Sequence, residues 1–172
     1  MLESLQVMMA RTQNRLVGAG HAASMLRASS YNEVLSYYGD VTNGIAYYNK
    51  LSQILKDYEN EYPKLVNALQ ELCTYIFSKE NLIISYTGSI EGLEILKDQL
   101  SSFINNLYAK RDAEEIFEFV PNQLNEGYKA PLDVQYVAMV GNFKRAGLEY
   151  TGSLQVFQNA ISTDYLWTNV RV

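Results

Sequence analysis

The residue types that catalyse reactions in proteins are scarce in this chain, and its one histidine sets the first limit. A catalytic zinc ion needs three protein ligands, commonly histidines with a glutamate or aspartate at a helical spacing such as His-x-x-Glu-His. His21 has no acidic residue one turn away, where the chain carries Val17, Gly18, Ser24 and Met25. A lone histidine in such a helical pattern more commonly packs or hydrogen-bonds than binds metal. The sequence therefore predicts no catalytic residue and no metal ligand in this chain.

The chain also lacks the residue patterns typical of nucleophilic catalysis and of phosphate binding. A serine or cysteine nucleophile needs a base beside it, and no serine stands between the glycines of a nucleophile elbow. Cys73 follows the apolar pattern of Leu69 and Leu72, so we interpret it as a buried packing thiol and not as a reactive one. The glycines at 18 and 20 stand inside a helical pattern and not after a strand, which argues against a phosphate-binding loop.

Two further groups of residues have both a structural and a chemical interpretation. Glu114 and Glu115 are suited to acid–base work, but neighbouring acids at the entrance of a strand are more commonly solvated. The chain has 14 tyrosines, and the pairs at 37–38 and 47–48 are expected to place one ring inward and one near the surface. Such amphipathic rings suit protein interfaces and cavity walls, although packing between helix and sheet is their commoner role.

Composition and charge exclude several classes of protein. Of the 172 residues, 48% are apolar and 19% charged, which is the balance of a folded chain and not of a disordered one. The net charge of −5 and the absence of basic clusters argue against a nucleic-acid partner. No apolar run reaches the ~20 residues of a membrane span, and the start of the chain lacks a signal-peptide core. We expect a cytoplasmic protein or one from the interior of an organelle.

Apolar residues at spacings of three and four predict helices over much of the chain. Ser29 and Ser30 offer a cap for the second of these helices, Pro63 is expected to separate the third from the fourth, and Ser89 to cap the fifth. The predicted helices cover residues 5–26, 30–38, 45–62, 63–76, 90–107 and 148–161.

Stretches rich in β-branched and aromatic residues predict three strands, at residues 81–87, 115–120 and 134–140. The expected fold class is therefore α+β, helix-rich with a small and mainly antiparallel sheet. The predicted elements are mostly helices before residue 110 and are two strands and a helix after it, which predicts one region at 1–109 and another at 110–172. The last helical pattern runs into residue 172 without a cap or a polar tail, so we expect a segment of a longer protein.

Several motifs resemble zinc peptidases of the pitrilysin/insulinase family. Residues 81–89 with the helix after them look like the end of one structural unit of that family, and residues 133–140 like the strand that opens the next unit. Residues 165–172 resemble the helix leading into the family's Arg-Val-x-Gly-Gly-Ala-Tyr-Gly motif. Residues 10–15 and 20–28 are similar to the presequence-protease branch.

The resemblance implies a large enzyme of four related units, each a metallopeptidase-type α/β sandwich, that encloses and degrades unfolded peptides. This chain would span the end of the third unit and the start of the fourth. The zinc ion and the catalytic glutamate would lie in the first unit, so this segment would hold no cofactor. Its partners would be the rest of its own polypeptide and a peptide substrate. Arg171 matches a substrate-holding arginine of the family, although the residue type alone indicates a solvated end of a helix.

A different class of function also fits the sequence. A stand-alone α+β interaction module would use the tyrosine-rich surface to bind a partner protein. The two hypotheses differ in whether a zinc motif lies several hundred residues upstream in the same reading frame.

With one histidine, we expect the isolated chain neither to bind zinc tightly nor to cleave unfolded peptides, because it cannot supply three ligands. Calorimetry with zinc and a quenched-peptide assay with and without chelator measure both properties. Sub-micromolar zinc affinity or chelator-sensitive cleavage would contradict the prediction.

Overall fold

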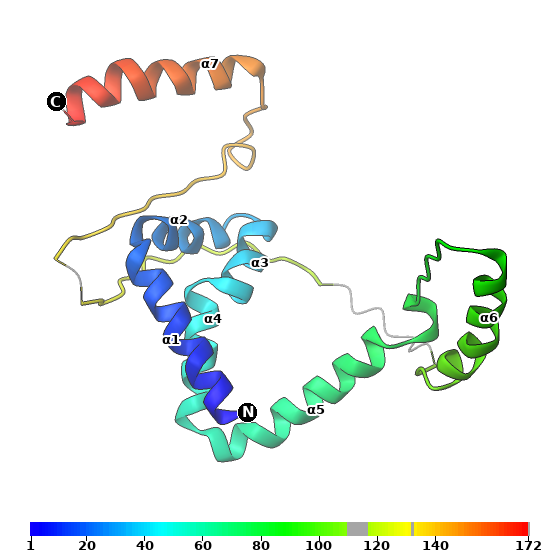
Figure 1. Ribbon diagram of the computed structural model, residues 1–172. Helices are drawn as coiled ribbons and strands as arrows, with labels where there is room; N and C mark the ends of the chain where they lie inside the picture. The colour runs from blue at the N-terminus through cyan, green and yellow to red at the C-terminus, as the bar shows by residue number, and fades with distance from the viewer. Residues whose placement is uncertain (110–116, 132, 172) are drawn as a thin grey trace. The chain divides into compact units, whose positions relative to one another are not determined.

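The regular elements of this computed structural model are helices, and the structure describes residues 1–109, 117–131 and 133–171 (Figure 1). Two compact units divide the chain, one of Met1–Ala10 with Asn49–Phe119 and the other of Arg11–Tyr48 with Val120–Val172. In chain order the elements are α1 (Leu2–Gly18), α2 (Gly20–Ser30), α3 (Val34–Asn43), α4 (Ile45–Lys56), α5 (Tyr58–Ile76), the short 3-10 helix η1 (Lys79–Asn81), α6 (Ile90–Asn105), α7 (Gly152–Ala160) and the π-helix η2 (Ile161–Arg171).

The predicted helices are confirmed as elements, and two of their starts are correct. The Ser89 hydroxyl accepts a hydrogen bond from the Gly92 amide at 3.2 Å, so α6 has the predicted cap. Helix α4 begins at Ile45 as expected. In the last helical region α7 continues directly into η2, and the two form one unbroken coil in Figure 1.

The predicted helix over residues 5–26 is broken at Ala19, whose φ of −132° and ψ of 49° are not helical. Two glycines flank this residue, and each lowers helix stability by about 1 kcal/mol relative to alanine. Gly20 is buried, and a Cβ atom there would lie 2.5 Å from the Tyr136 ring. The missing side chain therefore allows the aromatic ring to approach the start of α2.

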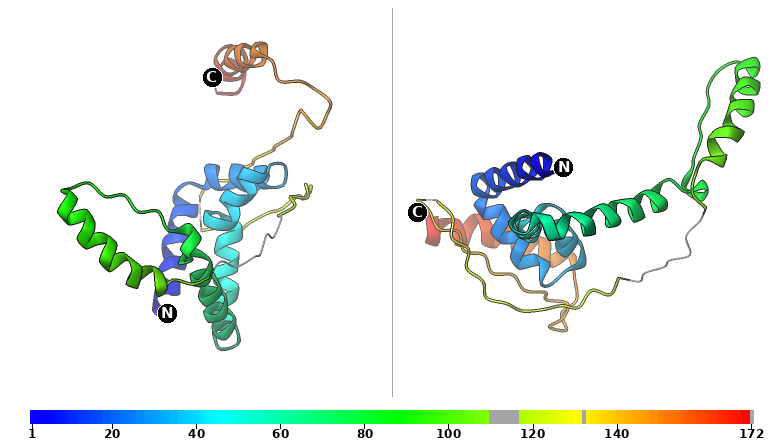
Figure 2. Two further views of the ribbon diagram at one scale, coloured as in Figure 1. Left: turned by 90° about the vertical axis from the view of Figure 1, so that its right-hand side faces the viewer. Right: turned by 90° about the horizontal axis from the view of Figure 1, so that it is seen from below.

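Two other helix boundaries differ from the prediction. Ser29 and Ser30 belong to the end of α2, and Glu33 caps α3 by accepting from the amides of Leu35 and Ser36 at 3.1 and 2.8 Å. The Ser36 hydroxyl also donates to this carboxylate at 2.8 Å, and this bond, followed by the two amide bonds, lowers the pKa of Glu33. The break between α4 and α5 is at Asp57, while Pro63 lies inside α5, which is continuous in the right view of Figure 2.

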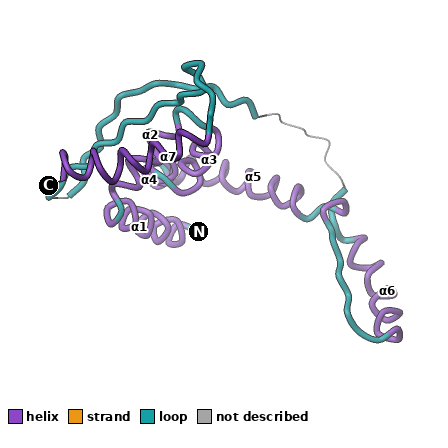
Figure 3. The backbone as a smooth tube through the Cα atoms, turned by 90° about the horizontal axis from the view of Figure 1, so that it is seen from above, coloured by secondary structure: helices purple, strands orange, loops and turns teal. Residues whose placement is uncertain are grey.

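The prediction of an α+β fold with a small antiparallel sheet is wrong for the described residues, which are helices and loops (Figure 3). Residues 82–87, 117–120 and 134–140 lie outside any strand, and residues 115–116 of the second predicted strand are outside the described residues. One isolated parallel bridge joins Ser78 and Tyr108. Strand propensity mainly measures how well side chains fit a paired sheet, so these stretches do not become strands where no partner is hydrogen-bonded beside them. The predicted division at residue 110 falls outside the described residues and stays a prediction.

Large apolar side chains are mostly exposed in the described residues. The buried ones are Leu5 of α1 with Leu51 and Ile54 of α4. On α5, the predicted apolar face carries Leu69, Leu72 and Ile76 with 42%, 51% and 53% of their surface exposed. Cys73 on the same helix is also exposed, so the prediction of a buried thiol is wrong. Within the described ranges, no helix is both long and apolar enough to cross a lipid bilayer.

We expect the isolated chain to associate with itself through such faces, because burying an exposed leucine contributes about 1.5–3 kcal/mol. Leu72→Glu should weaken this association at least about tenfold. Gln70→Glu is the matched control, since it adds the same charge about 200° away around the helix. Light scattering over a concentration series measures both variants, and a monomeric parent chain at high concentration would contradict the prediction.

Candidate functional site

The structure places the residues singled out from the sequence apart from one another. Arg171 is the last residue of η2, and its side chain lies outside what the structure describes, so its role stays a prediction. Glu114 and Glu115 also fall outside the described residues. His21 is exposed on α2, with its ring centroid 6.1 Å from that of Tyr136. Among the described residues, no group of three or more His, Cys, Asp and Glu could hold a metal ion.

The tyrosine pairs do not follow the expected pattern of one ring inward and one near the surface. Tyr37 and Tyr38 are both exposed, at 37% and 67%. Tyr47 and Tyr48 are both half-buried.

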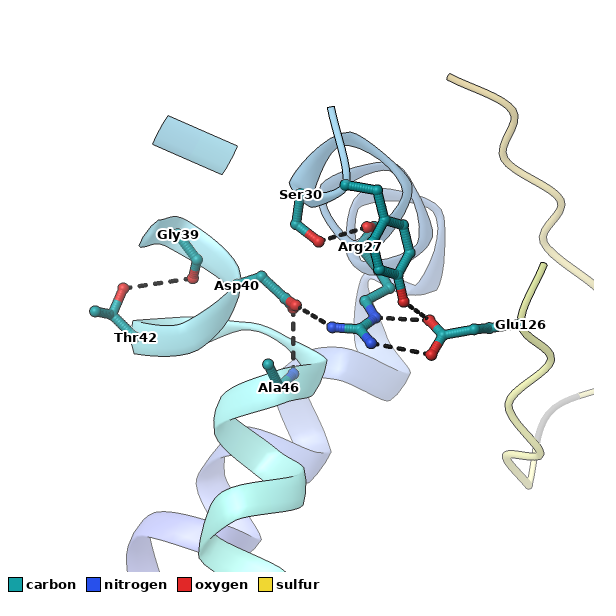
Figure 4. A network of polar contacts seen from close by, with 8 residues as sticks. Arg27, Ser30, Gly39, Asp40, Thr42, Ala46 and Glu126 are labelled. Atoms are coloured by element: carbon teal, nitrogen blue, oxygen red, sulfur yellow. Dashed lines mark hydrogen bonds and ion pairs between the residues drawn. The ribbon is translucent and has the colours of Figure 1, made fainter. Parts of the chain in front are cut away.

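A polar network around Arg27 of α2 is the best-defined cluster of ionisable groups among the described residues, and the sequence did not predict it (Figure 4). Its ionisable side chains come from three stretches: α2 with the turn after it, α3, and the loop of residues 117–131. We call the loop the 117–131 loop. Helices α2 and α3 pack against each other, which brings Arg27 beside Asp40.

Asp40 is the innermost member of the network, with 1% of its surface exposed. Its Oδ2 atom accepts from Arg27 Nη1 at 2.7 Å, and its Oδ1 atom accepts from the Ala46 amide at 3.2 Å in the first turn of α4. Asp40 therefore also caps α4, where a carboxylate is favoured by the unpaired amides of the helix start. Gly44 makes room for this carboxylate, since a Cβ atom there would lie 2.8 Å from the Asp40 Cα atom.

The other edge of the Arg27 guanidinium binds Glu126 of the 117–131 loop. Nε donates to Oε2 at 2.7 Å and Nη2 donates to Oε1 at 3.0 Å, which is the bidentate geometry that favours arginine–carboxylate pairs. Tyr31 supports the pair in two ways. Its hydroxyl donates to Glu126, and the guanidinium lies over its ring with 4.8 Å between the Arg27 Cζ atom and the ring centroid.

The pKa values in the network follow from these contacts. Hydrogen bonds from Arg27 lower the pKa of Glu126 from 4.5 to about 2, although partial burial opposes them. Hydrogen bonding to Glu126, followed by Asp40, raises the pKa of Arg27, and burial opposes this. Burial raises the pKa of Tyr31, and its hydrogen bond to Glu126 adds to the effect. Arginine and glutamate are therefore both charged, and Tyr31 is neutral and able to donate.

The network pairs opposite charges within the chain, and its groups are not suited to acid–base catalysis. A guanidinium with a raised pKa and a carboxylate with a lowered one cannot exchange protons near neutral pH. Only part of the network has a signal in the sequence. An acid shortly before the helix that starts at Ile45 is a known capping pattern, but Arg27 and Glu126 are 99 residues apart.

Known proteins that this chain is similar to include two whose similarity runs over nearly the whole chain. The chain is 32% identical over 163 residues, 95% of its length, to Protein HypA of Clostridium perfringens (strain 13 / Type A). It is 24% identical over 164 residues, again 95% of its length, to Presequence protease 1, chloroplastic/mitochondrial, of Arabidopsis thaliana. The chain spans 16% and 15% of the length of these curated relatives. No protein-family model and no solved structure matches.

The similarity to a presequence protease supports the resemblance to insulinase-like peptidases at a broad level, that of a peptidase-related segment. The name of the bacterial relative does not state an activity.

We expect the attachment of the 117–131 loop to depend on the charge of Glu126. Because the pKa of this carboxyl is lower in the folded chain, about 2 against 4.5, its contribution is complete above pH 4.5 and is lost as the pH falls toward 2. The Asn122 amide donates to the Tyr31 carbonyl at 3.0 Å, so its protection from hydrogen exchange reports the attachment.

Glu126→Gln should lower this protection about threefold to tenfold at neutral pH and flatten its dependence on pH. The lower end is expected because 26% of the Glu126 side chain is exposed. Glu118→Gln, in the same loop, is the matched control and should behave like the parent chain. Equal protection in all three proteins would show that the loop is held without the ion pair.

Proposed function

We propose that this chain is a non-catalytic segment of a zinc-dependent peptidase that degrades unfolded peptides, in which it builds chamber wall and holds substrate. The observation that carries the proposal is the extent of the similarity to a presequence protease, which covers 95% of this chain and 15% of that protein. A similarity that runs through the chain but spans a small share of a longer relative is typical of one segment of a larger polypeptide.

Exposed apolar side chains on α5 and α6 support this proposal. Leu69, Leu72 and Ile76 on α5, and Ile90, Ile95 and Phe103 at α6, expose between 42% and 77% of their surface. Large apolar patches on a protein surface mark places where another protein surface binds. In the proposal, the rest of the polypeptide covers these faces and also supplies the zinc ion and the catalytic glutamate.

The proposal is tested on the full-length polypeptide that contains this chain. That protein should bind zinc and cleave unfolded peptides, and chelation should abolish the cleavage. A full-length protein that binds a partner through its tyrosines, with neither zinc nor peptide turnover, would favour the interaction-module alternative.

Arg171→Ala in the full-length protein should lower kcat/KM for peptides about tenfold to a hundredfold and leave the zinc content unchanged. The proposed reason is a charge-assisted hydrogen bond to substrate, worth about 1.5–3 kcal/mol, and no metal ligand is removed. Arg171→Lys should recover little activity, because an ammonium cannot reproduce the planar fork of donors.

Arg11→Ala is a matched control, since Arg11 is exposed on α1 and lies outside residues 165–172, the stretch that carries the substrate-holding motif. Near-normal turnover of Arg171→Ala would contradict the substrate-holding role. Loss of zinc together with activity would show instead that the substitution unfolds the enzyme.

A further inference from the structure

The Arg27 guanidinium has two hydrogen-bonding edges that bind different carboxylates. Nη1 points to Asp40, which is buried and fixed in turn by the Ala46 amide. The Nε/Nη2 edge faces Glu126, which comes from a loop and not from a helix (Figure 4). The first carboxylate therefore positions the arginine, while the second occupies the edge that arginines use for bidentate recognition of carboxylates.

The groups around this edge are held in place without Glu126. Asp40 fixes the guanidinium from one side, and the Tyr31 ring lies against it, 4.8 Å from Arg27 Cζ to the ring centroid. The Tyr31 hydroxyl adds a third donor aimed at the same carboxylate. The three donors are Nε and Nη2 of Arg27 and the Tyr31 hydroxyl. Because their orientation is already fixed, binding an anion costs them little conformational entropy, and this favours a high affinity even for a small ligand.

Glu126, by contrast, is on a segment with few features that hold it. The described residues from 121 to 131 are all exposed and contain no regular element. The side chains of Arg27 and Glu126 are 20% and 26% exposed, so water reaches the ion pair. A carboxylate of the same chain that water reaches can act as an intramolecular competitor, whose effective concentration is in the millimolar range for a short connecting segment.

We propose that Arg27 and Tyr31 form a binding site for a peptide carboxylate, which Glu126 occupies from within the chain. The ligand is the C-terminal carboxylate of a peptide or the side chain of an acidic residue within it, and it takes the place of Glu126 on the Nε/Nη2 edge. Binding releases the 117–131 loop. The site does not depend on the proposed peptidase function, because every group in it belongs to this chain.

The test measures carboxylate binding to the chain and to Glu126→Gln, with the ring resonances of Tyr31 as the NMR signal. Acetate is the first probe. Glu126→Gln should bind it about tenfold more tightly than the parent chain, because the internal competitor is gone. Arg27→Lys/Glu126→Gln keeps the positive charge without the fork and should lose most of this gain. Equal affinity in the parent chain and Glu126→Gln, or unchanged binding in the lysine variant, would overturn the proposal.

Three matched peptides then distinguish the sources of the carboxylate: one with a free C-terminus and no acidic residue, one amidated with a single glutamate, and one amidated without acid. Binding of either of the first two supports the proposal and identifies the source. If the third peptide binds as tightly as the first two, the proposal is overturned. It is also overturned if acetate binds but none of the three peptides does.

Circular dichroism checks that the helices persist in each variant. Glu126→Asp is a second, milder variant, which keeps the charge but shortens the arm, and it should give an intermediate gain in affinity. Loss of helix in both Glu126 variants would show that this carboxylate is a required structural support and would overturn the proposal.

Discussion

The buried carboxylate of Asp40 is the constraint on which the arrangement of α2, α3 and the start of α4 depends. Removing an ion from water costs several kcal/mol unless it is paired and hydrogen-bonded. Here one oxygen accepts from Arg27 and the other from the Ala46 amide. Both contacts require defined positions of the neighbouring helices, since the donors come from α2 and α4 while the acid is on α3. A misplaced helix would leave the buried Asp40 carboxylate unpaired, which is strongly destabilising. The ion pair therefore favours this one arrangement of the helices over others.

Asp40 also affects the position of the 117–131 loop, because the Arg27 guanidinium contacts both Asp40 and Glu126 of that loop. Once Asp40 fixes one edge of Arg27, the opposite edge has a defined direction, and a carboxylate binds there with two oriented hydrogen bonds. The loop has no regular structure of its own, so its position near α2 comes from polar contacts such as that of Asn122 with the Tyr31 carbonyl. A loop held by polar contacts in reach of water is easier to displace than one held by apolar burial.

The sequence predicted the features whose causes are local. Periodicity located the helices, and Ser89 capped α6 as expected, because a cap and its amide lie within one turn. The predicted strands were wrong because a strand needs a second strand to pair with, and the strand propensity of a stretch does not show whether such a partner is present. Ala19 and Asp57 break helices through small local differences that periodicity does not resolve. The Arg27–Glu126 pair was missed because nothing local links residues 99 positions apart.

The residues that define the geometry of the helices in this chain differ from the residues that could supply hydrophobic stabilisation. Among the described residues of the unit that contains Arg27, the buried positions are small or polar: Thr12, Gly20, Ser30, Asp40 and Gly44. Such residues define geometry but remove little apolar surface from water. The apolar faces that the sequence encodes on α5 and α6 are exposed or half-buried, so their hydrophobic free energy is available only when another surface covers them. Polar pairing thus arranges α2, α3 and the start of α4 locally, with little contribution from apolar burial.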